Sequence, residues 1–201
     1  MFKLELLTAP TVEPITTDDA KTHARVFDSS SDDYIDGLIS AARQKFETES
    51  GFYLSEAEYK LTTRLEFFNR FNLYYFGFGF GSWFCHPNGH HLVLPLRPVF
   101  QVESVNSLVL DTDYEVSIDA MTGICTIHFL TSVPNDIVVT FKVGSENPAD
   151  GGDSTAPALA KHALKSLVSH WFENREAYQA GSSIKSVPAT YQSILTTYRL
   201  A

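Results

Sequence analysis

The chain has 201 residues, 44% of them hydrophobic and 19% charged, and its formal net charge is −9. This composition predicts a folded protein, either one generous domain or a domain with a sizeable insertion. The acidic balance argues against a general nucleic-acid binder, because such proteins neutralise phosphates with clustered Lys and Arg. An acidic wall that nucleic acid slides past is compatible with this charge.

The N-terminal segment, "MFKLELLTAPTVEP", has too short an apolar run for a secretory signal and is interrupted by Glu5 and Pro10. No segment approaches the roughly 18 to 20 apolar residues of a membrane helix, so we expect synthesis in the cytosol and no membrane contact. The two cysteines, Cys85 and Cys125, lack CxxC spacing, which favours neither a disulfide framework nor a zinc module.

Two helices are predicted in the first quarter of the chain. The first follows Thr16 or Thr17 as N-cap and has acidic residues in its first turn. The second follows cap candidates Ser29 to Ser31, ends at Gly51, and carries an apolar stripe of Ile35, Leu38, Ile39, Ala42 and Phe46.

A run of short segments rich in β-branched and aromatic residues follows, with turn residues between them. Strands spaced in this way indicate an antiparallel sandwich or a small barrel. The predicted strands lie within residues 58–68, 91–96, 101–110, 113–118, 123–129 and 136–144.

Helical patterning returns after a Gly/Pro/Asp-rich linker. Ser154 or Thr155 is the expected cap of a helix with Pro157 in its first turn, and its apolar stripe comprises Leu159, Ala163, Leu164, Leu167, Val168 and Trp171. A last helix begins at Pro188, with Tyr191, Ile194, Leu195 and Tyr198 at helical spacing.

We therefore predict an α+β fold: a small antiparallel helical bundle of N- and C-terminal helices with an inserted antiparallel β-sandwich or barrel. The predicted parts are residues 1–55 (helical), 56–146 (the β module, with an aromatic-glycine loop at 74–91) and 147–201 (helical, completing the bundle).

The aromatic-glycine loop contains Cys85, His86, His90 and His91, ligand types that zinc prefers, but their spacing matches no standard zinc module. We predict no metal site and no cofactor. The loop's rings would be costly to leave in water, which favours contact with a partner, the alternative being packing on the loop's own domain. The candidate interface residues here are Phe76, Phe78, Phe80, Trp83 and Phe84.

No catalytic set emerges from the other polar residues. The glycines of "FGFGFGS" do not fit GxGxxG, and no Walker lysine, GxSxG or HExxH is present. Asp18-Asp19 and Asp32-Asp33 lie where helix N-termini are expected, which favours capping; His23, His128 and His162 are isolated. In "HWFENREAYQAGSS", Trp171 continues an apolar stripe, so Glu173 and Arg175 are better interpreted as interface residues than as an acid-base pair.

The order of these motifs resembles the head-tail connector (adaptor) proteins of long-tailed double-stranded DNA phages. The similar segments are "LLTAPTVEPITTDDAKTHARV", "DDYIDGLISAARQKFETESGFYL", "LPLRPV" leading to Val102–Val105, and "PALAKHALKSLVSHWFENREA" followed by "VPATYQSILTTYR". They cover essentially the whole chain in order, and the aromatic-glycine loop is the main departure from the family.

The resemblance implies a non-enzymatic ring of about twelve copies in the virion neck, under the portal. The ring would extend the channel through which packaged DNA passes without specific binding. Its partners would be other copies of the chain, the portal protein, and a downstream stopper or tail-completion protein. The family's helical part would build the ring, its C-terminal segment would dock on the portal, and its β module would face outward or tailward. The tyrosine-arginine end adds Tyr191, Tyr198 and Arg199 to the candidate interface.

Two alternatives stay open at the level of sequence. One is a β-sandwich that binds a glycan or host-surface partner through the rings of the loop, because aromatic faces stack on sugars. The other is a metal-dependent hydrolase that uses Cys85, His86, His90 and His91.

Overall fold

The computed structural model describes residues 2–64, 91–131, 134–146, 154–174 and 187–199. The chain divides into two compact units. The sheet unit comprises Met1–Thr11, Glu56–Glu146 and Leu200–Ala201, and the helical unit comprises Val12–Ser55 and Asn147–Arg199. The α+β prediction, with helices toward both ends and antiparallel sheets between them, is confirmed.

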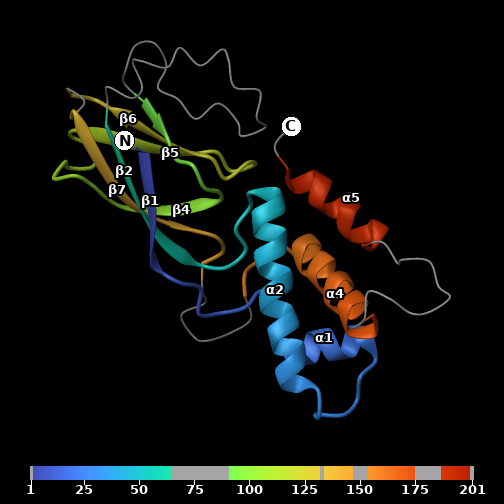
Figure 1. Cartoon of the computed structure of the whole chain (residues 1–201). Helices are drawn as coiled ribbons and strands as arrows, with labels where there is room; N and C mark the ends of the chain where they lie inside the picture. The colour runs from blue at the N-terminus through green and yellow to red at the C-terminus, as the bar shows by residue number, and fades with distance from the viewer. Residues whose placement is uncertain (1, 65–90, 132–133, 147–153, 175–186, 200–201) are drawn as a thin grey trace. The chain divides into compact units, whose positions relative to one another are not determined.

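The described strands of the sheet unit form two antiparallel sheets (Figure 1). The four-stranded sheet has the order β1 (Phe2–Thr8), β2 (Ala57–Arg64), β7 (Asp136–Val143), β4 (Val99–Val105). The three-stranded sheet has the order β3 (His91–Val93), β6 (Cys125–Phe129), β5 (Tyr114–Ile118).

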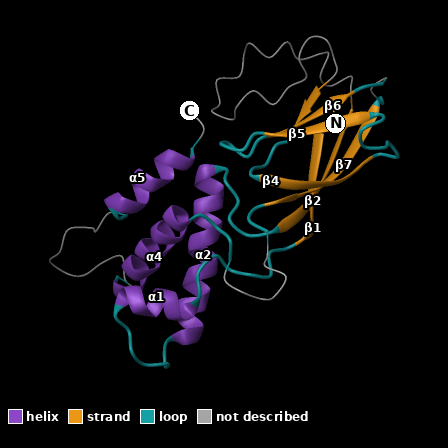
Figure 2. Cartoon of the chain, turned by 180° about the vertical axis from the view of Figure 1, so that it is seen from behind, coloured by secondary structure: helices purple, strands orange, loops and turns teal. Residues whose placement is uncertain are grey.

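The alternation of burial explains why the two sheets stack. In β7, Ile137, Val139 and Phe141 are fully buried, whereas the residues between them are partly exposed. β6 alternates in the same way, with Cys125 and Ile127 buried. A sheet with one apolar face must cover it with another element, and both views show the two sheets lying against each other (Figures 1 and 2).

Strand β1 was not expected, because no strand was predicted before residue 56. Phe2–Thr8 nevertheless pairs with β2, placing Leu4 opposite Leu61 and Leu6 opposite Tyr59. The residues from Phe2 to Leu6 alternate apolar and polar, which is a strand signal that the prediction missed, although no residue of β1 is fully buried. Hydrogen bonding to β2, and not burial, makes this segment a strand.

The helical unit contains α1 (Thr17–Ala24), α2 (Asp32–Ser50), α4 (Ala158–Glu173) and α5 (Ala189–Tyr198). The C-terminal end of α4 contacts α1 through His23 and Ser169, and α1 contacts the start of α2 through Lys21 and Asp32. Helices α2 and α4 therefore run in opposite directions, side by side (Figures 1 and 2). The core of the helical unit includes Ile35, Ile39, Phe46, Leu54, Ala163, Leu164, Leu167, Tyr191 and Ile194.

The helix ends agree with the prediction in the first half of the chain and at Pro188, the N-cap of α5, and differ at the start of α4. Thr16 caps α1 by accepting from the N–H of Asp19 at 3.1 Å, and Gly51 ends α2 in the left-handed conformation with φ 66°. Helix α4 begins later than expected: its N-cap is Pro157, not Ser154 or Thr155. Leu159, predicted to belong to the apolar stripe, lies within α4 but is 46% exposed, and the buried stripe begins at Ala160.

The predictions on the cysteines and on membrane-spanning helices can be compared with the described residues. Cys125 is a buried free thiol, and burial raises its pKa to about 12, so it carries no thiolate at neutral pH. Cys85 lies outside the described residues. None of the described helices combines the length and the apolarity needed to cross a membrane.

Candidate assembly surface

The candidate interface residues divide into two groups. Phe76, Phe78, Phe80, Trp83, Phe84 and Arg175 lie outside the described residues, as do Cys85, His86 and His90. Glu173, Tyr191, Tyr198 and Arg199 are described, and all four belong to the helical unit. Glu173 ends α4, Tyr191 and Tyr198 belong to α5, and Arg199 is the C-cap of α5.

Tyr191 holds α5 against α2. Its side chain is 1% exposed, its hydroxyl donates to Glu49 at 2.9 Å, and its ring meets the edge of Phe46. Burial, followed by the contact with the Glu49 carboxylate, raises the pKa of Tyr191, so the phenol stays protonated. Burial alone would raise the pKa of Glu49, but hydrogen bonds from Lys45 and Tyr191 hold it below its ordinary value.

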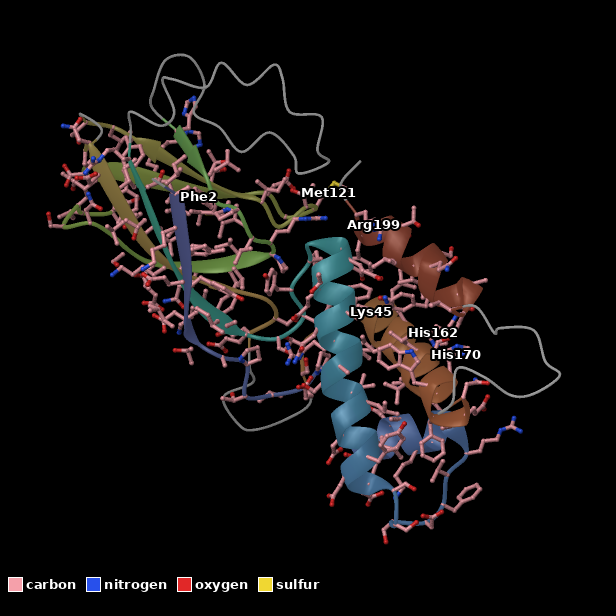
Figure 3. The ribbon with its side chains drawn as sticks, viewed as in Figure 1. Phe2, Lys45, Met121, His162, His170 and Arg199 are labelled. Atoms are coloured by element: carbon pink, nitrogen blue, oxygen red, sulfur yellow. The ribbon has the colours of Figure 1, made fainter. Side chains whose placement is uncertain are left out.

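Tyr198 and Arg199 complete the same contact at the end of α5. The Tyr198 ring packs edge-on against Phe46 and Phe52, at centroid distances of 5.4 and 4.9 Å. Arg199 Nε donates to the main-chain oxygen of Glu49 at 2.9 Å, near the end of α2. Figure 3 labels Lys45 on α2 and Arg199 at the end of α5. Tyr191 is therefore part of the core, whereas Arg199 is exposed.

Glu173 lies at the C-terminal end of α4. It is exposed, and the next residue, Asn174, donates from Nδ2 to the main-chain oxygen of His170 at 2.7 Å. Trp171 is partly buried against the helical core, as predicted from the apolar stripe. The described part of "HWFENREAYQAGSS" thus anchors a helix end and presents one exposed carboxylate.

A buried ionic cluster joins the entry segment to α2, and the sequence analysis did not identify it. Arg43 donates to Glu13 at 2.8 Å and to Glu47 at 3.0 Å. Arg43 and Glu47 are 7% and 8% exposed, and Glu47 also accepts from the N–H of Leu54 and Ser55. Burial raises the pKa of Glu47, and these donors oppose the rise. The four-residue spacing of Arg43 and Glu47 within α2 is the signal in the sequence that could have identified part of this cluster.

The acidic pairs lie in the first turns of α1 and α2, as predicted, and two of their members also pair with lysines. Asp19 accepts from Lys165 at 2.9 Å, and Asp32 accepts from Lys21 at 2.8 Å. The Lys165 hydrogen bond holds the pKa of Asp19 below its usual range, although burial opposes it. These contacts bind α1 to α4 and to α2.

The exposed apolar residues of the described chain are spread over both units. Phe27 is 95% exposed in the loop after α1, and Met121, labelled in Figure 3, is 96% exposed between β5 and β6. In the sheet unit, further apolar side chains at least 40% exposed are Phe2, Leu6, Leu7, Val109, Leu110, Ile118 and Leu130. Contiguous apolar patches mark surfaces that contact a partner, whereas single exposed apolar side chains are normal, so these residues do not by themselves define an interface.

Comparison with known families gives a match in sequence. Residues 14–68 match the family model of the phage gp6-like head-tail connector protein. The matched segment spans α1, α2 and the whole of β2. The resemblance to phage head-tail connectors is therefore confirmed over this part of the chain. A comparison with curated proteins finds no match.

Solved structures extend the likeness in fold to nearly the whole chain. A chain from the neck of an empty gene transfer agent (GTA) particle, computed with C6 symmetry, has a TM-score of 0.67 and 16% identity, with 99% of this chain and 96% of that chain covered. A chain from the virion of a native GTA particle gives 0.67 and 14%, covering 98% and 95%. A chain from the neck of a native GTA particle, computed with C12 symmetry, gives 0.59 and 15%, covering 99% and 96%. The protein thus resembles the phage gp6-like head-tail connectors in residues 14–68 and shares its fold with chains of GTA virions and their necks.

Proposed function

We propose that this protein is a non-enzymatic head-to-tail connector that forms a ring in the neck of a tailed phage or phage-like particle. The proposal is supported by two independent similarities, one in sequence and one in fold. Residues 14–68 match a connector family, and the fold matches neck chains over 99% of this chain. The particle would be assembled from chains made in the host cytoplasm.

A closed ring is supported by the C6 and C12 symmetry with which the similar necks were computed. A closed ring of six or twelve copies requires a heterologous interface that closes on itself, so two different faces of each copy meet. We propose about twelve copies in this ring. Its neighbours would be the portal protein on the capsid side and a stopper or tail-completion protein on the tail side.

The ring would extend the DNA channel without binding DNA specifically. The net charge of −9 supports this role, because a wall with few unpaired cations does not hold phosphates while DNA passes. We propose that the helical part builds the ring, that the C-terminal segment docks on the portal, and that the β module faces outward or tailward. Phe76, Phe78, Phe80, Trp83, Phe84, Glu173, Arg175, Tyr198 and Arg199 stay predicted interface residues. Tyr191, which is buried in the helical core, would act on the interface only by positioning α5.

Assembly with the portal tests this function directly. The purified chain is mixed with portal rings of the same particle, and the mixture is followed by sedimentation and electron microscopy. We expect the chain to co-sediment with the portal and to add a ring of density to one end of it. A chain that remains monomeric and fails to co-sediment at any concentration would overturn the proposal.

A further inference from the structure

The outer face of the three-stranded sheet brings three metal-ligating residues into one row. His91 of β3 lies opposite His128 of β6, and Glu115 of β5 lies opposite His128 on the other side. Their neighbours Leu92 and Ile127 are buried, so the row faces away from the core. The three residues, with Ser117 and Leu130, line a surface groove.

The two imidazoles already stand at a distance that suits a shared metal ion. The Nδ1 atoms of His91 and His128 are 3.0 Å apart, and the rings meet edge-on with their centroids 4.9 Å apart. A zinc-to-imidazole bond is about 2.0–2.1 Å, so two nitrogens on one ion are about 2.8–3.4 Å apart for bond angles from square to tetrahedral. In the hydrogen bond between the two rings one Nδ1 carries the proton that the other accepts, so a metal ion would take the place of this proton while that ring shifts its proton to Nε2.

We propose that His91 and His128 bind a divalent transition-metal ion of the zinc and nickel class through their facing Nδ1 atoms. Neutral imidazole is a preferred ligand of these ions. Among the residues that the structure describes, no three side chains converge as a ligand set, so water completes the coordination. Glu115 supplies a neighbouring negative charge. The ion joins β3, which has only three residues, to β6.

The site is a property of the sheet unit alone, and it does not depend on ring formation. Both histidines belong to that unit, and the backbone pairing that aligns them is present in the single chain. If the chain does not act as a connector, metal binding at this site is still expected. If no metal binds, the proposed connector function is unaffected.

Titration of the tag-free full chain with nickel chloride tests the site by calorimetry. We expect one dominant ion per chain, and weaker binding at about pH 5.5 than at about pH 7.5, because the imidazoles must lose their protons to bind. His91→Asn and His128→Asn should each lower the affinity at least about tenfold, since even loss of a group behind a ligand costs that much. Glu115→Gln should cause a smaller loss.

A second histidine pair provides the matched control. His23 and His162 also meet edge-on, with centroids 5.8 Å apart, and His162→Asn should leave nickel binding unchanged. Paramagnetic broadening of the His91 and His128 imidazole signals by Ni²⁺ in the wild-type chain gives a readout that requires no variant. No binding, binding that survives both substitutions, or broadening confined to other histidines would overturn the site and leave a His–His hydrogen bond only.

Discussion

At the scale of single residues, Arg43 has the largest predicted effect on stability. Replacing it with Met leaves the Glu47 carboxylate buried without its cation, and breaking a buried ion pair costs about 3–5 kcal/mol. We expect Arg43→Met to lower the free energy of unfolding of the helical unit by about 3 kcal/mol, because Glu47 keeps two main-chain donors. Denaturant unfolding followed by helical circular dichroism measures this loss.

The matched control for Arg43 is Lys165→Met in the same unit. Lys165 and Asp19 have side chains 25% and 44% exposed, and partly exposed pairs contribute only about 0–1 kcal/mol. If both substitutions cost the same, burial is not what makes the Arg43 cluster important. Neither Glu13 nor Leu54 could have been assigned to this cluster from the sequence, because both join it through folding of the chain.

At the scale of elements, the contact between α1 and α4 should depend on pH through His23. Its Nδ1 lies 2.9 Å from Ser169 Oγ, and burial, then the charges of His162 and Lys165, lower its pKa. The unfolded chain therefore binds a proton more readily than the folded chain as pH falls through about 6.5. The stability of this contact should accordingly decline from about pH 7.5 to about pH 5.5.

The melting temperature of wild type and His23→Asn across this range isolates the effect. Other titrating groups are common to both chains, so they cancel in the difference between the two pH profiles. We expect a shallower decline for the variant, since it has no proton to gain at this position. A variant that loses stability as steeply as the wild type would show that His23 does not couple pH to the docking of α1.

At the scale of the whole molecule, Glu173→Ala should separate assembly from folding. Glu173 is exposed at the end of α4, so its removal should change the free energy of unfolding by no more than about 0.5 kcal/mol. We expect it to impair ring formation with the portal. Gln44→Ala, at an exposed position of α2 outside the candidate interface, is the control in the same sedimentation assay. Normal assembly of Glu173→Ala would remove this residue from the interface.

The sequence by itself determined the fold class, because the helices and most strands bury one face and therefore show a period in the residues. The stripe of α2 from Ile35 to Phe46 and the alternation in β7 are of this kind. The resemblance to connector proteins was also present in the order of motifs, and the match of residues 14–68 confirms it for that segment.

Only the tertiary structure decided the features that depend on contacts far apart in the chain. The apolar-polar alternation from Phe2 to Leu6 already indicated a strand, but its partner β2 and their register came only from the fold. Tyr191 lies in the core, where its hydroxyl donates to Glu49. His128, isolated in the sequence, lies opposite His91 in the sheet. Periodicity reports which face of an element is buried, but it does not report which element covers that face or in what register. That choice is made when the whole core packs together.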